Sequence, residues 1–176
     1  MTGAVQFGRC GLRVSRLSLG TMMFGTQADF ATSEAIADYA LDHGVFFWDT
    51  ADMYGKGASE EVCGRLMKGR REEVVLATKV YAQMSDLPND RGLSAKHIVR
   101  ACDQSLRRLQ TDYIDILELL PCRCHAVCRS NYPEHADAPH YSIADTVRTA
   151  EKLVRKGAVR YLGVSRYTTA QLRAAG

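Results

Sequence analysis

Apolar runs of strand length alternate with amphipathic helical stretches along the chain. Val45–Trp48 is a continuous apolar run, as expected of a strand buried on both faces. Other short runs have the same character, and a small hairpin is predicted within Phe7–Val14. The predicted strands of the main sheet are Leu17–Gly20, Val45–Trp48, Val74–Thr78, Tyr113–Leu117 and Val159–Val164.

Helices are predicted between these strands, where apolar residues recur every three or four positions. The first is Ser33–His43, with Ser33 as its N-cap and Gly44 as its stop. The other predicted helices are Ser59–Met67, a helix capped by Ser94, Ser142–Lys156, and a helix capped by Thr168 or Thr169. The helix after Ser94 carries a core-facing stripe formed by Ile98, Ala101, Cys102, Leu106 and Leu109.

Strands that alternate with helices predict an α/β fold built from βαβ units around a parallel sheet. The two main architectures of this class are an open doubly wound sheet and a (β/α)8 barrel. No G-x-G-x-x-G fingerprint follows the first strand, so the dinucleotide-binding motif of the open fold is missing. A complete barrel takes about 250 residues. We therefore expect a partial (β/α)8 barrel with about five βα units and its helices outside.

Composition excludes several classes of protein. The chain has 176 residues, 46% hydrophobic and 24% charged, which argues against a disordered, collagen-like or coiled-coil protein. The net charge of +3 is small and evenly spread, so no nucleic-acid partner is expected. No apolar run approaches the roughly 18–20 residues of a membrane helix, and the first residues lack a signal-peptide pattern. We expect a cytoplasmic protein without a membrane partner.

Candidate catalytic side chains stand at the ends of successive predicted strands. Asp49, Lys79 and Ser165 each follow a strand, and Tyr54 lies in the loop after the second one. In a parallel barrel these positions open onto one rim, where catalysis takes place. A free tyrosine has a pKa of about 10, too high for an efficient acid, but a nearby lysine ammonium favours the phenolate. This set predicts proton transfer from Tyr54 to a carbonyl oxygen while hydride arrives at the carbon.

Each of these residues also has a structural interpretation. Asp49 could cap the turn after its strand, Lys79 could be a solvated loop lysine, and Tyr54 could be an amphipathic residue at the rim. Ser165 suits a turn or an anion site better than the role of a nucleophile. The case for chemistry therefore depends on the four residues meeting at one edge of the sheet.

The motifs around these residues resemble the aldo-keto reductase family, most of all its branch with the potassium-channel beta subunits and their bacterial relatives. The resemblance keeps the family's order and spacing from about residue 10 onward, except over about 118–140. The segments that carry it are Leu19–Gly25, Asp49–Gly55, Ser59–Glu61 with Gly64-Arg65, Ala77–Val80, Ser105–Leu109, Asp112–Asp115 and Gly157–Ser165.

The resemblance implies a (β/α)8 barrel, NADPH as cofactor, and reduction of a small carbonyl substrate, an aldehyde or ketone, to an alcohol. Asp49, Tyr54 and Lys79 match three members of the family's catalytic tetrad, with Tyr54 as general acid. Ser165 matches the serine that binds the nicotinamide carboxamide. The cofactor-binding residues implied in this way are Gly20, Thr21, Met22, Asp49, Ser165 and Arg166. No metal ligand is implied.

The chain departs from the family pattern at several places. Leu120 stands where the family has its fourth catalytic residue, a histidine, and Arg166 stands where the family has an asparagine. By this resemblance, residues 1–176 are expected to form one unit, the N-terminal portion of a barrel that lacks its later strands. Such a portion has exposed strand edges, which predict self-association.

The cysteines are predicted to be reduced thiols, since Cys63 and Cys102 lie in helical patterns rather than spread out to close loops. Cys122, Cys124 and Cys128, with His125, crowd into the divergent segment 118–140. This segment has three interpretations: a zinc site, an ordinary loop insertion, or a local disturbance of the reading frame.

Two main functions remain open at this point. The first is an NADPH-dependent reductase that uses Asp49, Tyr54 and Lys79. The second is a catalytically inactive half-barrel fragment or accessory subunit that acts through protein association. A small metal-binding protein built on the cysteine cluster is a third.

Overall fold

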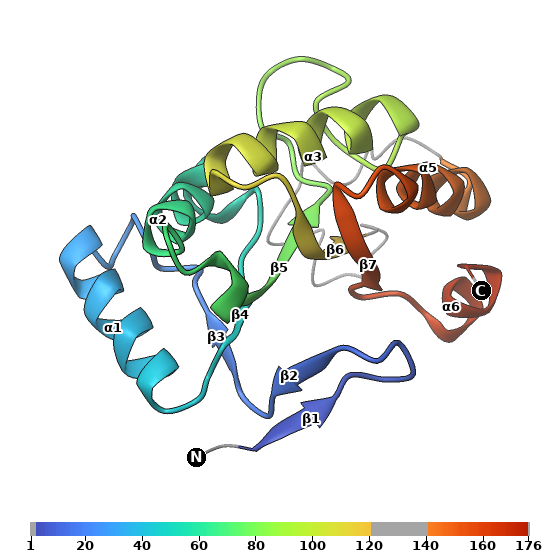
Figure 1. The fold of residues 1–176 in the computed structure, drawn as a ribbon. Helices are drawn as coiled ribbons and strands as arrows, with labels where there is room; N and C mark the ends of the chain where they lie inside the picture. Colours follow the sequence, from blue (N-terminus) through green and yellow to red (C-terminus); the bar gives the residue numbers. More distant parts are fainter. Residues whose placement is uncertain (1–2, 121–140, 176) are drawn as a thin grey trace.

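The computed structural model describes residues 3–120 and 141–175, and its strands form an arc with the helices on the convex side (Figure 1). In this part of the chain the main sheet has five strands in the order β3-β4-β5-β6-β7, all parallel to their neighbours. The strands are β3 (Ser18–Gly20), β4 (Phe47–Asp49), β5 (Val75–Val80), β6 (Ile114–Leu119) and β7 (Val159–Val164). The helices are α1 (Phe30–Asp42), α2 (Ala58–Leu66), α3 (Ala95–Leu109), α5 (Ile143–Arg155) and α6 (Thr169–Ala175).

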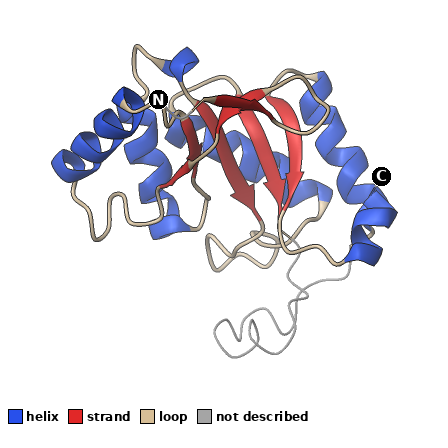
Figure 2. Cartoon of the chain, turned by 90° about the horizontal axis from the view of Figure 1, so that it is seen from below, coloured by secondary structure: helices blue, strands red, loops and turns tan. Residues whose placement is uncertain are grey.

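This architecture confirms the predicted α/β class. Each strand pairs with its neighbours in chain order, as successive βα units of a (β/α)8 barrel do. Figure 2 shows the strands side by side with helices flanking them. The sheet is the arc of a partial barrel, and its two edges are β3 and β7.

The strand register divides the sheet into two faces. Asp49 pairs with Gly20 and Ala77, and Lys79 pairs with Glu118, which in turn pairs with Gly163. Since neighbouring positions in register share a face, these side chains lie on the concave, inner face. Residues of the opposite parity face the helices and are buried with them; they include Trp48, Leu76, Thr78, Val80, Leu117 and Leu119.

The hydrophobic core lies between the outer face of the sheet and the helices. The predicted stripe of α3 is confirmed, with Ile98, Ala101, Cys102 and Leu109 buried and Leu106 partly buried against the same core. Burial of each large aliphatic side chain contributes about 1.5–3 kcal/mol. This core fixes the strands whose ends carry the candidate site.

Of the predicted helix caps, Ser94 and Thr168 are confirmed and Ser33 is wrong. Ser94 accepts a hydrogen bond from the His97 amide, and Thr168 accepts one from the Gln171 amide at the start of α6. Ser142, where a helix was predicted to begin, caps α5 by accepting from the Asp145 amide. The first helix begins at Phe30, earlier than predicted, because Asp29 accepts the capping bond from the Thr32 amide at 2.8 Å. Ser33 lies inside α1, where its hydroxyl donates to the Asp29 carbonyl at 2.7 Å.

The N-terminal hairpin also differs from the prediction. Its strands are β1 (Ala4–Gln6) and β2 (Arg13–Ser15), so the expected segment Phe7–Val14 is mostly the connection between them. Phe7 packs edge-on against Phe47 with ring centroids 5.8 Å apart. The hairpin therefore lies at the amino-terminal end of the strands and leaves their carboxyl ends open.

The predictions for the cysteines are tested only in part. Cys63 and Cys102 lie in helices as predicted, and both are free thiols, as is Cys10. The segment with Cys122, Cys124, His125 and Cys128 lies outside the described residues, so its interpretations are untested. No helix among residues 3–120 and 141–175 has the length and apolar character of a membrane span.

Candidate active site

Asp49 and Lys79 meet at the carboxyl ends of two neighbouring strands. Asp49 ends β4, and Lys79 lies two residues beyond the position with which Asp49 pairs on β5. The Lys79 ammonium donates to Asp49 Oδ1 at 2.6 Å and to the Thr50 carbonyl at 2.9 Å. The lysine side chain is only 12% exposed. The predicted pairing of this carboxylate with this ammonium is present in the structure.

Tyr54 reaches the same ammonium from the turn that follows β4. The short 3₁₀ turn η1 (Tyr54–Gly57) includes left-handed backbone at Gly55 and Lys56, with φ of 58° and 53°. A Cβ at Gly55 would lie 2.6 Å from the Thr26 methyl, so this tight turn requires glycine. Within it, Tyr54 Oη accepts a hydrogen bond from Lys79 Nζ at 3.4 Å.

The electrostatics of Lys79 result from two opposing effects. Burial lowers its pKa, but the hydrogen bond and the negative charge of Asp49 raise it, and the balance lies above the ordinary value of 10.5. The ammonium is therefore charged at neutral pH. Its position 5.1 Å from the centre of the Tyr54 ring allows it to stabilise a phenolate at that residue.

A network of buried hydroxyl groups connects the end of β4 to β3 and α2. Thr21 Oγ1 donates to the Asp49 carbonyl at 3.0 Å and lies 2.9 Å from Ser59 Oγ, which in turn lies 2.9 Å from Thr50 Oγ1. Ser59 also donates to the Thr21 carbonyl at 2.8 Å. These contacts join β3, β4 and the start of α2 next to the site. The hydroxyl of Thr21, a predicted cofactor residue, is thus engaged inside the protein.

The remaining predicted cofactor residues lie at the same edge of the sheet but on its outer strands. Gly20 pairs with Asp49 and is exposed, with nothing within 4 Å of a Cβ built on it. Met22 is exposed in the turn after β3. Ser165 follows β7, where its amide donates to the Leu119 carbonyl at 3.2 Å, and Arg166 has left-handed backbone with φ of 58°.

Leu120 follows β6, next to the site. Its amide donates to the Val80 carbonyl at 3.3 Å, and its side chain packs against the hydrophobic core. A leucine cannot donate a hydrogen bond to a substrate. The side chain at the end of β6 therefore adds no hydrogen-bond donor to the candidate site around Lys79.

Two buried or half-buried carboxyl groups near the site were missed by the sequence analysis. Glu118 lies on the inner face opposite Lys79. Asp52 is 1% exposed in the loop between Asp49 and Tyr54. Burial raises the pKa of Asp52 to about 8, with a further increase from the charge of Glu60 and an opposing effect from Arg108. The alternation along β6 could have indicated that Glu118 faces away from the helices, although not that it lies opposite Lys79, and nothing in the local pattern marks Asp52 as buried.

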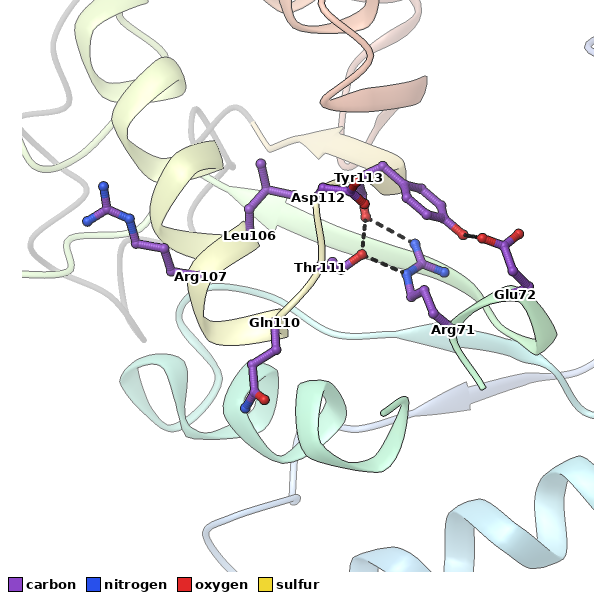
Figure 3. Close-up of a pocket in the computed structure, with 8 residues that line it drawn as sticks. All are labelled: Arg71, Glu72, Leu106, Arg107, Gln110, Thr111, Asp112 and Tyr113. Carbon is purple, nitrogen blue, oxygen red and sulfur yellow. Dashed lines mark hydrogen bonds between the residues drawn. The ribbon is translucent and has the colours of Figure 1, made fainter. Parts of the chain in front are cut away.

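A separate pocket lies beyond the amino ends of β5 and β6 (Figure 3). Several of its polar groups bond to one another or to β6: Arg71 donates to Thr111 Oγ1, to the Tyr113 carbonyl and to Asp115, and Tyr113 donates to Glu72. Active sites of parallel barrels lie at the opposite, carboxyl end. We therefore take the Asp49–Tyr54–Lys79 cluster, and not this pocket, as the candidate active site.

Comparison with known proteins gives a consistent result. The family model described as "Aldo/keto reductase family" matches residues 16–175. An uncharacterized oxidoreductase of Bacillus subtilis, YrpG, is 44% identical over 172 residues, covering 91% of this chain and 48% of its own. A probable voltage-gated potassium channel subunit beta of Arabidopsis thaliana is 37% identical over 169 residues, covering 94% of this chain and 47% of its own. The chain spans about half the length of the curated relatives it matches.

Solved structures agree with this result. An aldo-keto reductase from Klebsiella pneumoniae, in complex with NADPH, superimposes with a TM-score of 0.74 at 35% identity, covering 99% of this chain and 53% of the other. The aldo-keto reductase AKR11C1 from Bacillus halodurans, in its holo form, gives a TM-score of 0.73 at 34% identity, covering 94% of this chain and 50% of the other. The resemblance on which the sequence analysis relied is confirmed.

Proposed function

Because the chain belongs to the aldo/keto reductase family, we propose that the protein reduces an aldehyde or ketone to an alcohol with NADPH, and that Tyr54 is its general acid. The observation that carries the proposal is the contact of one ammonium, Lys79, with both the Tyr54 hydroxyl and the Asp49 carboxylate. A small carbonyl compound is the substrate class that this chemistry needs.

The proton-transfer step uses these three side chains. The O–H bond of Tyr54 breaks as its proton moves to the carbonyl oxygen of the substrate, and the developing phenolate is stabilised by the Lys79 ammonium. Asp49 holds the ammonium in place and keeps it charged. The phenolate then regains a proton from Lys79.

The residues around the rim fit a nicotinamide cofactor, which supplies the hydride for the carbonyl carbon when bound. The open space at Gly20, beside the Asp49 carboxylate, leaves room for a flat ring. The Ser165 hydroxyl can donate to and accept from a carboxamide, while Arg166 offers only donors. We propose that Gly20, Met22, Asp49, Ser165 and Arg166, with the backbone of Thr21, contribute to holding this group.

The absence of a hydrogen-bond donor at Leu120 should lower the rate of the reaction. Since it offers no hydrogen bond to the substrate carbonyl, Tyr54 must both orient and protonate that oxygen. We expect slower turnover than in a site with an additional donor, because each donor aimed at a developing oxyanion contributes about 10²–10³ in kcat.

A binding titration and a turnover assay together test this function. NADPH fluorescence should change in a saturable manner on addition of the full chain, and NADPH should be consumed when a generic aldehyde is added. A chain that neither alters NADPH fluorescence nor consumes NADPH contradicts the proposal. Binding without turnover would retain the cofactor site but reject the reductase activity.

A second candidate function is a catalytically inactive unit or accessory subunit that acts through protein association in the cytoplasm. It is favoured by the two open edges of the described sheet, β3 and β7, because unpaired strand edges are templates for another chain. Size-exclusion chromatography at several concentrations tests it. A folded monomer at every concentration contradicts self-association.

A further inference from the structure

Glu118 occupies a position on the inner face from which it can act on the candidate site. It lies on β6 directly opposite Lys79 of β5, and both side chains project from the same face of the sheet. Asp49 approaches Lys79 from the other side, on β4. The ammonium is therefore flanked by a carboxyl group on each neighbouring strand.

The strand on the far side of Glu118 leaves room for its side chain. Gly163 of β7 pairs with Glu118, and a Cβ at Gly163 would lie 3.0 Å from Glu118 Cγ and 3.2 Å from the Ile116 methyl Cγ2. Any larger residue at position 163 would press on the methylene chain of Glu118. The absence of a side chain at Gly163 thus leaves room for the Glu118 side chain on the inner face of the sheet.

The two carboxyl groups differ in their bonding. Asp49 is tied to Lys79 by a 2.6 Å hydrogen bond. The carboxyl group of Glu118, by contrast, forms no hydrogen bond or ion pair with the residues that the structure describes, and the residue is half-buried rather than enclosed. A carboxyl group in this position can exchange a proton with water, and through one water with the Lys79 amine.

The charges that face Glu118 determine its protonation. Burial raises its pKa above the ordinary 4.5, the Lys79 cation opposes this, and the Asp49 carboxylate adds to it. Among the described residues, the other ionisable groups nearby are Tyr54, beyond Lys79, and Tyr161 of β7, which pairs with Ile116, two residues before Glu118. A larger fraction of Glu118 is therefore in the acid form near neutral pH than for an exposed glutamate.

We propose that Glu118 is a positioning residue that acts through Lys79, by returning a proton to the lysine amine after Lys79 has given one to the Tyr54 phenolate. This rests on the proposed reductase function. In the step, the O–H bond of the Glu118 acid breaks, one water between the two groups relays the proton, and an N–H bond forms on Lys79. The Glu118 carboxylate then takes a proton from water at the open inner face. No electron transfer occurs in this step, since it moves only a proton.

The first test measures the carboxyl group itself and needs no turnover. The full chain is labelled with ¹³C at the side-chain carboxyl carbon of glutamate, and the Glu118 resonance is identified by its absence in Glu118→Gln. We expect it to titrate above the ordinary pKa of 4.5. In Lys79→Met the pKa of Glu118 should rise further, because the cation that lowers it is gone. An ordinary pKa that does not respond to Lys79→Met overturns the proposal.

The second test is the pH profile of kcat for NADPH-dependent reduction. Glu118→Gln should lower kcat by about tenfold or more and change its pH dependence, with KM unchanged, since general acid–base groups contribute about 10²–10⁴. Glu118→Asp keeps an ionisable group and should recover part of the loss. Glu34→Gln, an exposed glutamate of α1, is the control.

The outcomes distinguish this proposal from the function on which it rests. A wild-type chain that binds no NADPH and does not turn over overturns both. An active wild-type chain whose Glu118→Gln variant keeps the same kcat at every pH overturns the role of Glu118 alone.

Discussion

The ammonium of Lys79 lies 2.6 Å from the carboxylate of Asp49, and the two residues come from adjacent parallel strands. This contact follows from the strand register. Asp49 pairs with Ala77, and Lys79 lies two residues beyond Ala77 on the same face of β5, nearer the carboxyl end of the sheet. The long lysine side chain reaches across the neighbouring strand, where the Thr50 carbonyl binds it as well. The geometry of the site is therefore set by the backbone of the sheet.

Lys79→Met should remove this support. The substitution keeps the length of the side chain but leaves the Tyr54 hydroxyl without its cation. We expect reductase kcat to fall by about 10²–10⁴, the range typical of general acid–base groups. Lys56→Met, an exposed lysine in the same turn as Tyr54, is the matched control. Equal rates for the two variants would contradict the role of Lys79.

Gly55→Ala should displace the turn that carries Tyr54. The native φ of 58° is costly for alanine, and the new Cβ would lie 2.6 Å from the Thr26 methyl. We expect a loss of about 1–3 kcal/mol in the free energy of unfolding. Urea denaturation measures this loss, and Gly3→Ala, where a Cβ meets nothing within 4 Å, provides the control. Unchanged stability would show that the turn tolerates a side chain.

Arg108→Met should destabilise the protein strongly. Arg108 donates to Glu60 at 2.6 Å, and the Glu60 carboxylate is fully buried on α2. Removing the cation leaves a buried charge without its partner, which costs about 3–5 kcal/mol. Chemical denaturation should show this loss. The exposed Arg107→Met is the comparison, and an equally small effect of both would contradict the account of this ion pair.

Asp52 should make the stability of the protein depend on pH. Because its folded-state pKa of about 8 lies above the ordinary value of 3.8, the folded protein holds a proton that the unfolded chain releases. Stability from this group is fully present at low pH and is lost as pH rises from about 4 to about 8. Asp52→Asn carries no charge, so its advantage over wild type in Tm should grow as pH rises through this window.

Thermal unfolding at about pH 5 and about pH 8 checks this expectation, and 1 kcal/mol corresponds to about 2–4 °C in Tm for a chain of this size. Asp42→Asn, at the exposed end of α1, is the control. Parallel pH dependences of wild type and Asp52→Asn would contradict a raised pKa at Asp52.

Much of the fold could be predicted from the sequence. The apolar run Val45–Trp48 and the similar stretch before Lys79 indicated buried strands, and strand ends in a parallel sheet share an edge. That argument alone predicts that Asp49, Tyr54 and Lys79 lie close together. The prediction of Ser33 as a helix cap was wrong, because Asp29, another residue type that caps helices well, stands one turn earlier and the helix begins at Phe30.

The inner face of the sheet was harder to predict. Glu118 lies within a strand rather than after it, and only the pairing of β6 with β5 shows that it faces Lys79. Register depends on contacts between distant segments, which the local pattern does not encode. The burial of Asp52 was missed for a similar reason, since α2 and the Tyr81 region enclose it from elsewhere in the chain.

The rate of NADPH-dependent aldehyde reduction by Tyr54→Phe tests the central claim most directly. Phenylalanine keeps the ring but removes the proton that the carbonyl oxygen needs, so the rate at saturating substrate should fall by about 10²-fold or more. Tyr39→Phe, which changes a tyrosine that is 67% exposed on α1, should retain the wild-type rate. An active wild-type chain whose Tyr54→Phe variant reduces the aldehyde equally fast would contradict the account.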